Sequence, residues 1–217
     1  MKKQFYILFL LLGMFSSACS TDLKPAPEPY EKKTKAIMMG NSITEIWYNT
    51  RGSFFGNNNI ISAGIGGQTS GQMLERFEVD VVRKSPKAVS ILCGINDIAQ
   101  NQGYVSNEKI CENIKAMASL ASQAGIRVIL CSVLPSKKIG WNTSVGNPAP
   151  LVADLNIKIK NLALANGYSY LDYYSVLVDD KGGLPSHLTT DEVHVTDACY
   201  EIMESMYLQK LKEVLGE

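Results

Sequence analysis

The sequence has no excess charge of either sign, because its 21 lysines and arginines are balanced by 21 aspartates and glutamates. Long basic runs are absent as well. Proteins that hold nucleic acid by charge gather lysine and arginine on one face, so this composition argues against a nucleic-acid partner. After the first 15 residues, no apolar run approaches the length of a membrane span.

Histidine and cysteine are scarce, and common metal and nucleotide motifs are missing. His187 and His194 are the only two histidines, and no Cys-x-x-Cys or Cys/His spacing of a zinc site occurs. Neither a G-x-x-x-x-G-K-[ST] loop nor a G-x-G-x-x-G fingerprint is present. Two of the four body cysteines lie inside apolar runs, where buried thiols are common, so we predict no structural disulfide among Cys93, Cys111, Cys131 and Cys199.

What the sequence does contain begins with a targeting segment. Lys2 and Lys3 precede an apolar stretch over residues 5–15, and small residues then lead into Cys19. Eleven residues are too few to span a membrane as a helix, so residues 1–18 are predicted to be a signal peptide. The small residues before Cys19 resemble a bacterial lipobox, which implies cleavage before Cys19 and lipidation of its thiol. The alternative is a plain secretory signal with an incidental cysteine.

The segment after the signal peptide is predicted to be a lipidated N-terminus and flexible tether. Residues 19–35 carry three prolines among charged residues and have no apolar core. The folded domain is expected over residues 36–217, a length that suits one domain with a sizeable core. These features predict an exported lipoprotein that meets a membrane only through its N-terminal anchor, at the periplasmic face or the cell surface.

Short apolar runs alternate with longer amphipathic stretches through the rest of the chain. The predicted strands cover residues 36–39, 60–62, 88–93, 127–133 and 168–171. The predicted helices cover residues 72–84, 108–124, 151–166 and 195–215. This alternation indicates an α/β fold, a three-layer α/β/α sandwich with a parallel, doubly wound (flavodoxin-like) sheet of about five strands. In such a sheet, function gathers at the carboxyl ends of the strands.

The first three predicted strands each end in a polar motif. Ser42 lies in Gly-Asn-Ser-Ile-Thr, where its hydroxyl can face a ligand, although such serines are more often turn or helix-capping residues. Residues 63–69 include three glycines, which suit close backbone approach to a ligand or, alternatively, a phosphate cradle. Asn96, in Gly-Ile-Asn-Asp, offers a side-chain amide to an oxyanion or else closes an Asx-turn.

Near the end of the chain, the motif Asp191-Glu192-Val193-His194 pairs an acid with a histidine. An aspartate three residues before a histidine can bind its Nδ1, fix the tautomer and leave Nε2 free to take a proton from a hydroxyl. A metal site formed by His187, Asp191 and His194 is the competing interpretation, although these residues lack the helical spacing of a zinc protease.

Taken together and in this order, the four motifs resemble those of the SGNH (GDSL) hydrolase family over nearly the whole predicted domain. The resemblance implies a serine esterase in which Ser42 is the nucleophile, His194 the base and Asp191 its orienting acid. It also implies an oxyanion hole made by the backbone N–H groups of Ser42 and Gly67 and the side chain of Asn96. No metal or organic cofactor is implied.

Two positions depart from the family pattern. Asn41 stands where the family usually has an aspartate before the nucleophile, so the hydrogen bonding of the serine turn is expected to differ while the triad acid is retained. Cys199 stands where related sequences usually have glycine, which is expected to alter helix packing near the histidine more than the chemistry.

The substrate is predicted less directly. Residues 136–150 follow the fourth strand and carry the candidate substrate-binding residues Trp141 and Asn142; Trp141 suits stacking on a sugar or, alternatively, a hydrophobic lid. Exported members of the family often resemble carbohydrate esterases, so the expected substrate is a short acyl ester, mainly acetyl, on a glycan or small molecule. The alternatives are a lysophospholipase, a thioesterase or a platelet-activating-factor-acetylhydrolase-like enzyme, and, in a different class, an inactive glycan-binding module.

Replacing Cys19 by alanine is expected to release the protein from membranes, because acyl chains on that thiol supply the predicted anchor. Fractionation of cells that express each form measures this release. The Cys111→Ala variant, which keeps Cys19, is the matched control and is expected to stay with the membranes. Retention of Cys19→Ala in the membrane fraction contradicts the lipidation.

Overall fold

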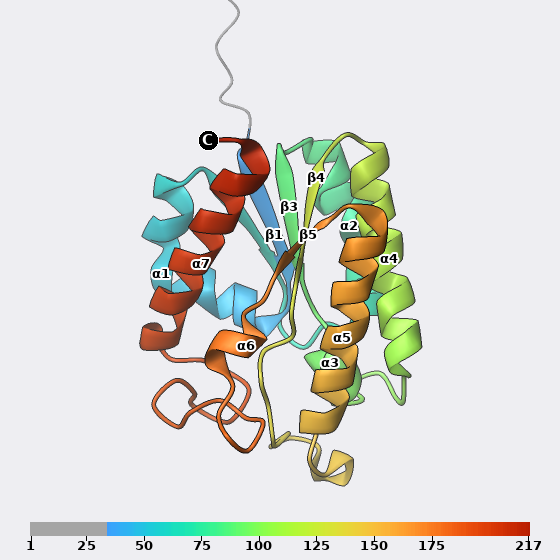
Figure 1. Ribbon diagram of the computed structural model, residues 1–217, viewed down its shortest axis with the longest axis vertical. Coiled ribbons are helices and arrows are strands. Elements are labelled where there is room, and N and C mark those ends of the chain that lie inside the picture. Colours follow the sequence, from blue (N-terminus) through green and yellow to red (C-terminus); the bar gives the residue numbers. More distant parts are fainter. Residues whose placement is uncertain (1–33) are drawn as a thin grey trace, which may run out of the picture. The chain divides into compact units, whose positions relative to one another are not determined.

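A five-stranded parallel sheet forms the centre of the fold (Figure 1). The computed structural model describes residues 34–217, which belong to one unit. The strands lie in the order β2-β1-β3-β4-β5 and are β1 (Ala36–Gly40), β2 (Ile60–Gly64), β3 (Ala88–Leu92), β4 (Arg127–Cys131) and β5 (Ser169–Leu171). All five predicted strands are present, and their order is that of a doubly wound, flavodoxin-like sheet.

Helices cover both faces of this sheet, which confirms the three-layer prediction. On one face lie α1 (Ser42–Asn57) and α7 (Asp197–Leu215); on the other lie α2 (Ser70–Asp80), α4 (Asn107–Gln123) and α5 (Ala149–Asn166) (Figure 1). Every residue of β1 and β3 is buried, because these central strands are covered from both sides. Burial on both faces explains why their sequences are almost continuously apolar.

The predicted helices are present, with a correction at one helix end. The bounds of α4, α5 and α7 agree with prediction to within two residues. The helix predicted over residues 72–84 instead ends at Asp80, because Val81 leaves helical geometry with a φ of −122°. A 3-10 turn, η1 (Val82–Lys84), follows, and Ser85 ends it in a left-handed conformation before Pro86. Helix α1 (Ser42–Asn57) was not among the predicted helices. Three segments too short to show periodicity were not predicted either: α3 (Ile95–Ile98), η2 (Thr143–Val145) and α6 (Tyr174–Leu177).

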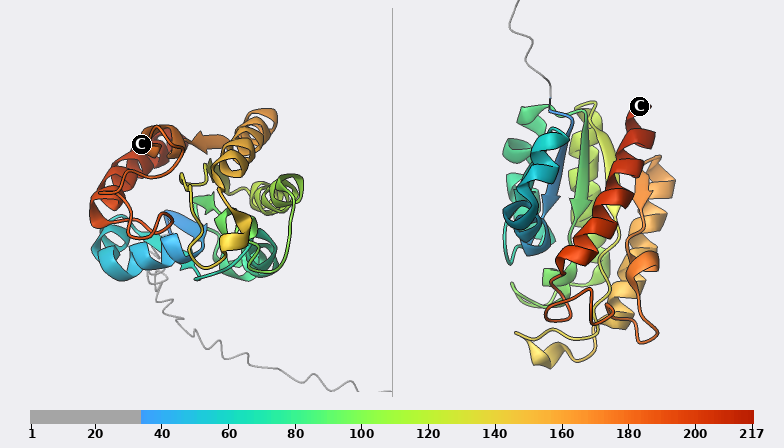
Figure 2. Two further views of the ribbon diagram at one scale, coloured as in Figure 1. Left: turned by 90° about the horizontal axis from the view of Figure 1, so that it is seen from below. Right: turned by 90° about the vertical axis from the view of Figure 1, so that its left-hand side faces the viewer.

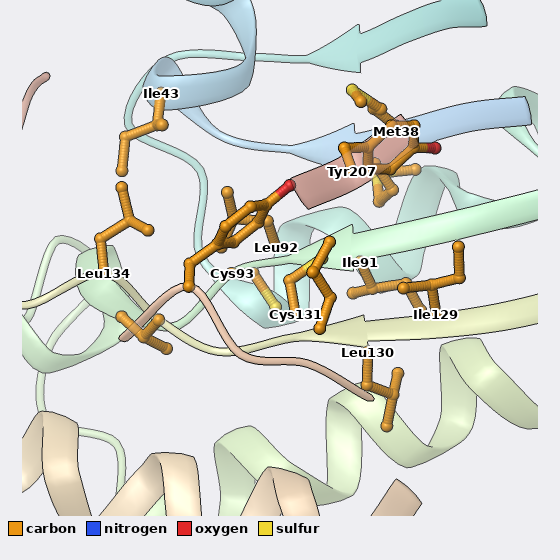
Figure 3. Packing of buried hydrophobic residues seen from close by; sticks show 14 of the residues in the cluster. Met38, Ile43, Ile91, Leu92, Cys93, Ile129, Leu130, Cys131, Leu134 and Tyr207 are labelled. Carbon is orange, nitrogen blue, oxygen red and sulfur yellow. The ribbon is translucent and has the colours of Figure 1, made fainter. Parts of the chain in front are cut away.

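The four body cysteines are free thiols in the structure. Cys93 and Cys131 lie at the ends of β3 and β4 among buried aliphatic side chains (Figure 3). Burial raises the pKa of the Cys131 thiol to about 12. A thiol in such surroundings stays protonated and inert at neutral pH.

The strand order reverses between β1 and β3, and this reversal positions the site. The chain leaves β1 through α1 toward β2 on one side, whereas it leaves β3 through α4 toward β4 on the other. The two segments therefore diverge at the carboxyl edge of the sheet, where open α/β folds bind their ligands. The left view of Figure 2 looks onto this edge.

The predictions for the N-terminus concern residues that the structure mostly does not describe. The predicted signal peptide over residues 1–18 and the lipidated Cys19 fall outside the described residues, as does the tether over residues 19–35 apart from its last two residues. Within residues 34–217, none of the helices has the length and hydropathy that a membrane span requires.

The first turn of α1 lies directly against the ends of β1 and β2. A Cβ on Gly40 would collide with the side chain of Thr44, and a Cβ on Gly64 would collide with the backbone of Thr44 and Glu45. Gly40 and Gly64 are neighbours in the strand register. Glycine is therefore required at both strand ends because a helix approaches them closely.

Helix α7 is hydrogen-bonded to α1 across the same face of the sheet. Tyr200 Oη donates to the carbonyl of Ile43 at 2.8 Å. Glu204 accepts hydrogen bonds from Trp47 Nε1 at 3.1 Å and from Arg51 Nε at 2.6 Å. The last helix of the chain thus fixes the helix that begins at Ser42.

The Gly64→Ala variant is expected to lower the free energy of unfolding by about 1–3 kcal/mol, because the added Cβ meets backbone atoms that have no room to move. Urea unfolding measures the difference. Gly56→Ala, in an exposed part of α1 with open space around it, is the matched control and is expected to be neutral or about 1 kcal/mol more stable. If Gly64→Ala is as stable as the wild type, the close approach of α1 to Gly64 does not require glycine there.

Candidate active site

Ser42 lies at the point where β1 ends and α1 begins. Asn41 caps the helix, because its Oδ1 accepts the N–H of Ile43 at 3.0 Å. An amide thus serves as the cap where the family pattern has a carboxylate. Ser42 is the first helical residue, so its N–H has no partner within the helix. Its Oγ lies 2.9 Å from Nε2 of His194, which brings the first and last of the four motifs together.

His194 is held in a tight turn by main-chain contacts. Its carbonyl accepts hydrogen bonds from Thr189 Oγ1 at 2.8 Å and from the Thr190 N–H at 2.9 Å. Asp191 Oδ1 accepts the backbone N–H groups of Val193 at 3.0 Å and His194 at 2.7 Å, while Asp191 Oδ2 lies 2.7 Å from His194 Nδ1. Donation from Nδ1 to this carboxylate selects the tautomer in which Nε2 accepts a hydroxyl proton.

The environment of Asp191 favours its ionised form. Burial acts to raise the pKa of this carboxyl, but hydrogen bonds from the side chain and backbone of His194 and from the Val193 N–H outweigh it, and the pKa lies below the usual aspartate value. A carboxylate beside Nδ1 stabilises a protonated imidazole. That is the charge that removal of a proton from Ser42 creates on His194.

Asn96 and the glycine-rich segment after β2 reach the same edge. Asn96 is buried in α3, and its Nδ2 donates to the carbonyl of Gln68 at 2.9 Å; the amide carries a second N–H beyond this bond. Gly67 has a φ of +74°, in the left-handed region that suits glycine. A Cβ on the neighbouring Gly66 would lie 3.9 Å from Cβ of Ser42, so this segment lies beside the serine.

Asp97 joins the Asn96 motif to the start of α2. Its buried carboxylate accepts the Ser70 N–H at 2.9 Å and the Ser70 hydroxyl at 2.6 Å, and Ser70 Oγ accepts from Asn113 Nδ2 at 2.9 Å. Burial raises the pKa of Asp97 above the usual aspartate value, while the hydrogen bonds from Ser70 act to lower it. Because α2 follows the glycine-rich segment, this contact fixes that segment relative to Asn96.

Arg76 of α2 is a supporting residue that the sequence analysis missed. Its Nη2 donates to the carbonyls of Gly40 at 3.1 Å and Ala63 at 2.8 Å, and its Nε donates to Gln68 Oε1 at 2.6 Å. Asp80 pairs with the same guanidinium at 2.8 Å. The planar fork therefore ties the ends of β1 and β2 to the glycine-rich segment. The available signal was an arginine beside the apolar stripe of a predicted helix.

A cavity of about 590 Å³ lies next to the glycine-rich segment that flanks Ser42, although neither Ser42 nor His194 lines it. Trp141 lines it, with its ring centroid 6.2 Å from that of His194, and so do Gly66 and Gly67. Carboxamide side chains supply most of the remaining lining: Gln68, Gln72, Gln100, Asn101, Gln102 and Asn142. Such a surface is uncharged and both donates and accepts hydrogen bonds.

Trp141 and Asn142 both line this cavity, but their side chains form different hydrogen bonds. Trp141 is 47% exposed, and its Nε1 donates to Asn101 Oδ1 at 2.8 Å, while Asn101 Nδ2 donates to the Gly67 carbonyl at 3.0 Å. Asn142 donates through Nδ2 to the carbonyl of Ala99 at 2.9 Å, and its Oδ1 caps η2. Asn142 therefore orders its own loop. Asn101 lies in an irregular segment, and no sequence signal marked its link between Trp141 and Gly67.

The residues of the alternative metal site do not form a cluster. The Asp191 carboxylate is bound to the ring and backbone of His194, and His187 is exposed. Across residues 34–217, no three histidine, cysteine, aspartate or glutamate side chains gather in a way that suits a metal ion. The described residues therefore do not bring His187, Asp191 and His194 together as a metal site.

Comparison with known proteins finds one family model and several similar solved structures. The model of the GDSL-like lipase/acylhydrolase family matches residues 38–202. A solved structure from Bacteroides fragilis, assigned as an acylhydrolase, is 40% identical, with a TM-score of 0.83 and coverage of 87% of this chain and 91% of that one. A GDSL-like lipase from Bacteroides thetaiotaomicron is 38% identical, with a TM-score of 0.82 and coverage of 85% and 91%.

More limited matches are to a lipoprotein and to distant structures that share the fold. The uncharacterised lipoprotein YqeF of Bacillus subtilis is 36% identical over 83 residues, which cover 37% of this chain and only 34% of that protein. An acetylxylan esterase of Geobacillus stearothermophilus, solved as a catalytic mutant, is 18% identical, with a TM-score of 0.66 and coverage of 82% and 94%. A Streptococcus pneumoniae protein named for platelet activating factor is 21% identical, with a TM-score of 0.71 and coverage of 84% and 86%. The last two show a shared fold alone.

Proposed function

Because the chain belongs to the GDSL-like lipase/acylhydrolase family and is a carboxylic ester hydrolase, we propose that Ser42, His194 and Asp191 form its catalytic triad. The observation that carries this proposal is a continuous line of short contacts. Ser42 Oγ lies 2.9 Å from His194 Nε2, and His194 Nδ1 lies 2.7 Å from Asp191 Oδ2. Acyl transfer by a serine requires a nucleophile, a base and an orienting acid within this reach of one another.

In the proposed reaction, His194 takes the proton of Ser42 as Oγ attacks the carbonyl carbon of the ester. Asp191 orients the imidazole and stabilises its positive charge. The tetrahedral intermediate then collapses, His194 protonates the leaving alcohol, and an acyl-serine remains. Water attacks the acyl-serine with His194 as base, which releases the carboxylic acid and restores the serine.

We propose that the backbone N–H groups of Ser42 and Gly67 and the second N–H of Asn96 bind the developing oxyanion. The Ser42 N–H is unused by its helix, and the Asn96 amide is buried and oriented by an existing hydrogen bond. Donors that are fixed before the reaction need no reorganisation when charge develops. Arg76 and Asp97 support this arrangement, because they hold the segments that carry the donors.

The lining of the cavity supports an acetyl ester on a carbohydrate as substrate. Carboxamides donate and accept hydrogen bonds, as sugar hydroxyls do, and Trp141 adds an aromatic face close to His194. A long acyl chain requires an apolar pocket, whereas Trp141 is the one large apolar side chain in this lining. The Geobacillus acetylxylan esterase shares the fold, which is compatible with such a substrate.

A lipid or thioester substrate is the second candidate. Ile65 is 40% exposed beside Gly66, and an apolar side chain at this position suits a longer acyl group. The Streptococcus protein named for platelet activating factor and the acetylxylan esterase both share the fold, with TM-scores of 0.71 and 0.66, so the fold alone does not decide between the candidates. A glycan-binding module without activity has no need of the contact between Ser42 and His194, and that contact favours an enzyme.

We further propose that the enzyme is a lipoprotein anchored through Cys19. In this proposal residues 1–18 are the signal peptide, residues 19–35 the tether and residues 36–217 the hydrolase domain. The N-terminal sequence and the identity to the lipoprotein YqeF over 83 residues support it. In this proposal the site binds only the acyl ester substrate, and the protein contacts the membrane only through its lipid anchor.

The Ser42→Ala variant is expected to lose turnover of p-nitrophenyl acetate, because no other hydroxyl lies against His194 Nε2 in the described chain. Asn96→Ala is expected to lower kcat by about 10²–10³, the usual loss of one oxyanion donor. Spectrophotometric assay of the purified proteins measures both. Ser53→Ala, an exposed serine of the same helix, is the matched control. Wild-type turnover by Ser42→Ala disproves the triad.

The Trp141→Ala variant is expected to raise KM for acetylated oligosaccharides about tenfold more than KM for p-nitrophenyl acetate, which corresponds to about 1.4 kcal/mol of sugar binding. Acetate release from a panel of acetylated polysaccharides, beside acetyl to octanoyl nitrophenyl esters, measures the preference. Tyr104→Ala, an aromatic residue 79% exposed outside the cavity lining, is the control. Faster turnover of octanoyl than acetyl esters instead favours the lipid alternative.

A further inference from the structure

Lys137 links the loop that carries Trp141 to the turn that carries His194. Its Nζ lies 2.9 Å from Asp179 Oδ2 and 3.6 Å from Glu192 Oε2, and the three side chains are mostly buried, with exposed fractions of 29%, 17% and 29%. Glu192 Oε2 is closed to solvent and makes no hydrogen bond within residues 34–217. Lys137 is therefore the cation that offsets this buried charge.

Glu192 lies between Asp191 and His194 in an uncommon backbone conformation. Its φ of +76° is in the left-handed region, which residues with a Cβ rarely adopt. Its N–H donates to Thr189 Oγ1 at 2.9 Å, and that hydroxyl donates to the His194 carbonyl. Such a conformation persists where the surroundings fix it. The ion pair with Lys137 supplies a contact from outside the turn.

Lys137 is itself held firmly by the segment after α6. Asp179, its other partner, accepts the backbone N–H groups of Lys181 at 2.9 Å and Gly183 at 2.8 Å through Oδ1. A Cβ on Gly183 would come within 2.6 Å of Lys137 Cδ, so the lysine methylenes lie against that glycine. The contacts with Asp179 and Gly183 thus fix the position of the ammonium group independently of Glu192.

We propose that Lys137 is a positioning residue for His194. Its ion pair holds Glu192 in the left-handed conformation, and the turn of residues 191–194 then presents Nε2 to Ser42 at 2.9 Å. The inference rests on the proposed function, because Lys137 acts on the reaction through the base alone. The lysine does not contact the reacting groups.

The Lys137→Met variant is expected to lower kcat for p-nitrophenyl acetate about tenfold or more with little change in KM, since a misplacement of about 1 Å costs up to about 100-fold in rate. Lys137→Arg keeps the charge and is expected to restore most of kcat. Lys138→Met removes the neighbouring exposed lysine and is expected to match the wild type. A wild-type kcat for Lys137→Met overturns the proposal.

A double variant tests whether Lys137 acts through the backbone of Glu192. Glycine takes a positive φ without strain, so in the Glu192→Gly background the turn no longer needs an outside anchor. Lys137→Met is then expected to cost less than about twofold in kcat relative to Glu192→Gly alone. A tenfold loss of kcat in the Glu192→Gly background overturns the proposed route through Glu192. Equal losses in both backgrounds indicate that Lys137→Met damages the fold in general.

Two further measurements keep the outcome unambiguous. If Lys137→Met fails to fold, as judged by thermal unfolding, Glu192→Gln replaces it, because this variant breaks the ion pair while keeping the strained φ and the side-chain shape. The same loss of kcat is expected, and a wild-type kcat overturns the proposal. Ser42→Ala distinguishes failure of the proposed triad from failure of the proposed role of Lys137. If Ser42→Ala keeps its activity, the triad is disproved. If Ser42→Ala is inactive while Lys137→Met is fully active, the triad stands and only the role of Lys137 is disproved.

Discussion

The close approach of the first turn of α1 to the ends of β1 and β2 is the constraint on which the site depends. Gly40 and Gly64 stand side by side in the strand register and leave room for this turn. A larger side chain at either position displaces the turn and, with it, both Oγ and the N–H of Ser42. The positions of the proposed attacking atom and of one proposed oxyanion donor therefore depend on the same two steric contacts.

Charged side chains outside the proposed chemistry hold the segments around Ser42 in place. Arg76 binds the carbonyls of Gly40 and Ala63 at the ends of β1 and β2, and the Gly40 carbonyl also accepts the N–H of Ile65 at 3.2 Å. Asp97 binds the N–H of Ser70 at the start of α2. Buried charges are costly unless they are fully hydrogen-bonded, so such residues are better evidence for fixed geometry than for added stability. Each of them joins segments that are distant in sequence.

The sequence predicted the sheet and the gathering of the motifs because both follow from local pattern. The central strands are buried on two faces and form unbroken apolar runs, and parallel strands bring the motifs at their ends to one edge. The contacts of Arg76 and Lys137 were not predictable, because periodicity describes one element at a time and these side chains join several. Asn142 shows the same limit: its residue type suits a ligand, but its loop uses both of its polar atoms.

The bonding of α7 to α1 ties the start of the domain to its end. His194 lies just before α7, 152 positions after Ser42, and Tyr200 of α7 fixes the first turn of α1 through the Ile43 carbonyl. Loosening of α7 therefore disturbs both sides of the contact between Ser42 and His194, because this helix follows the histidine and is hydrogen-bonded to the first turn of α1.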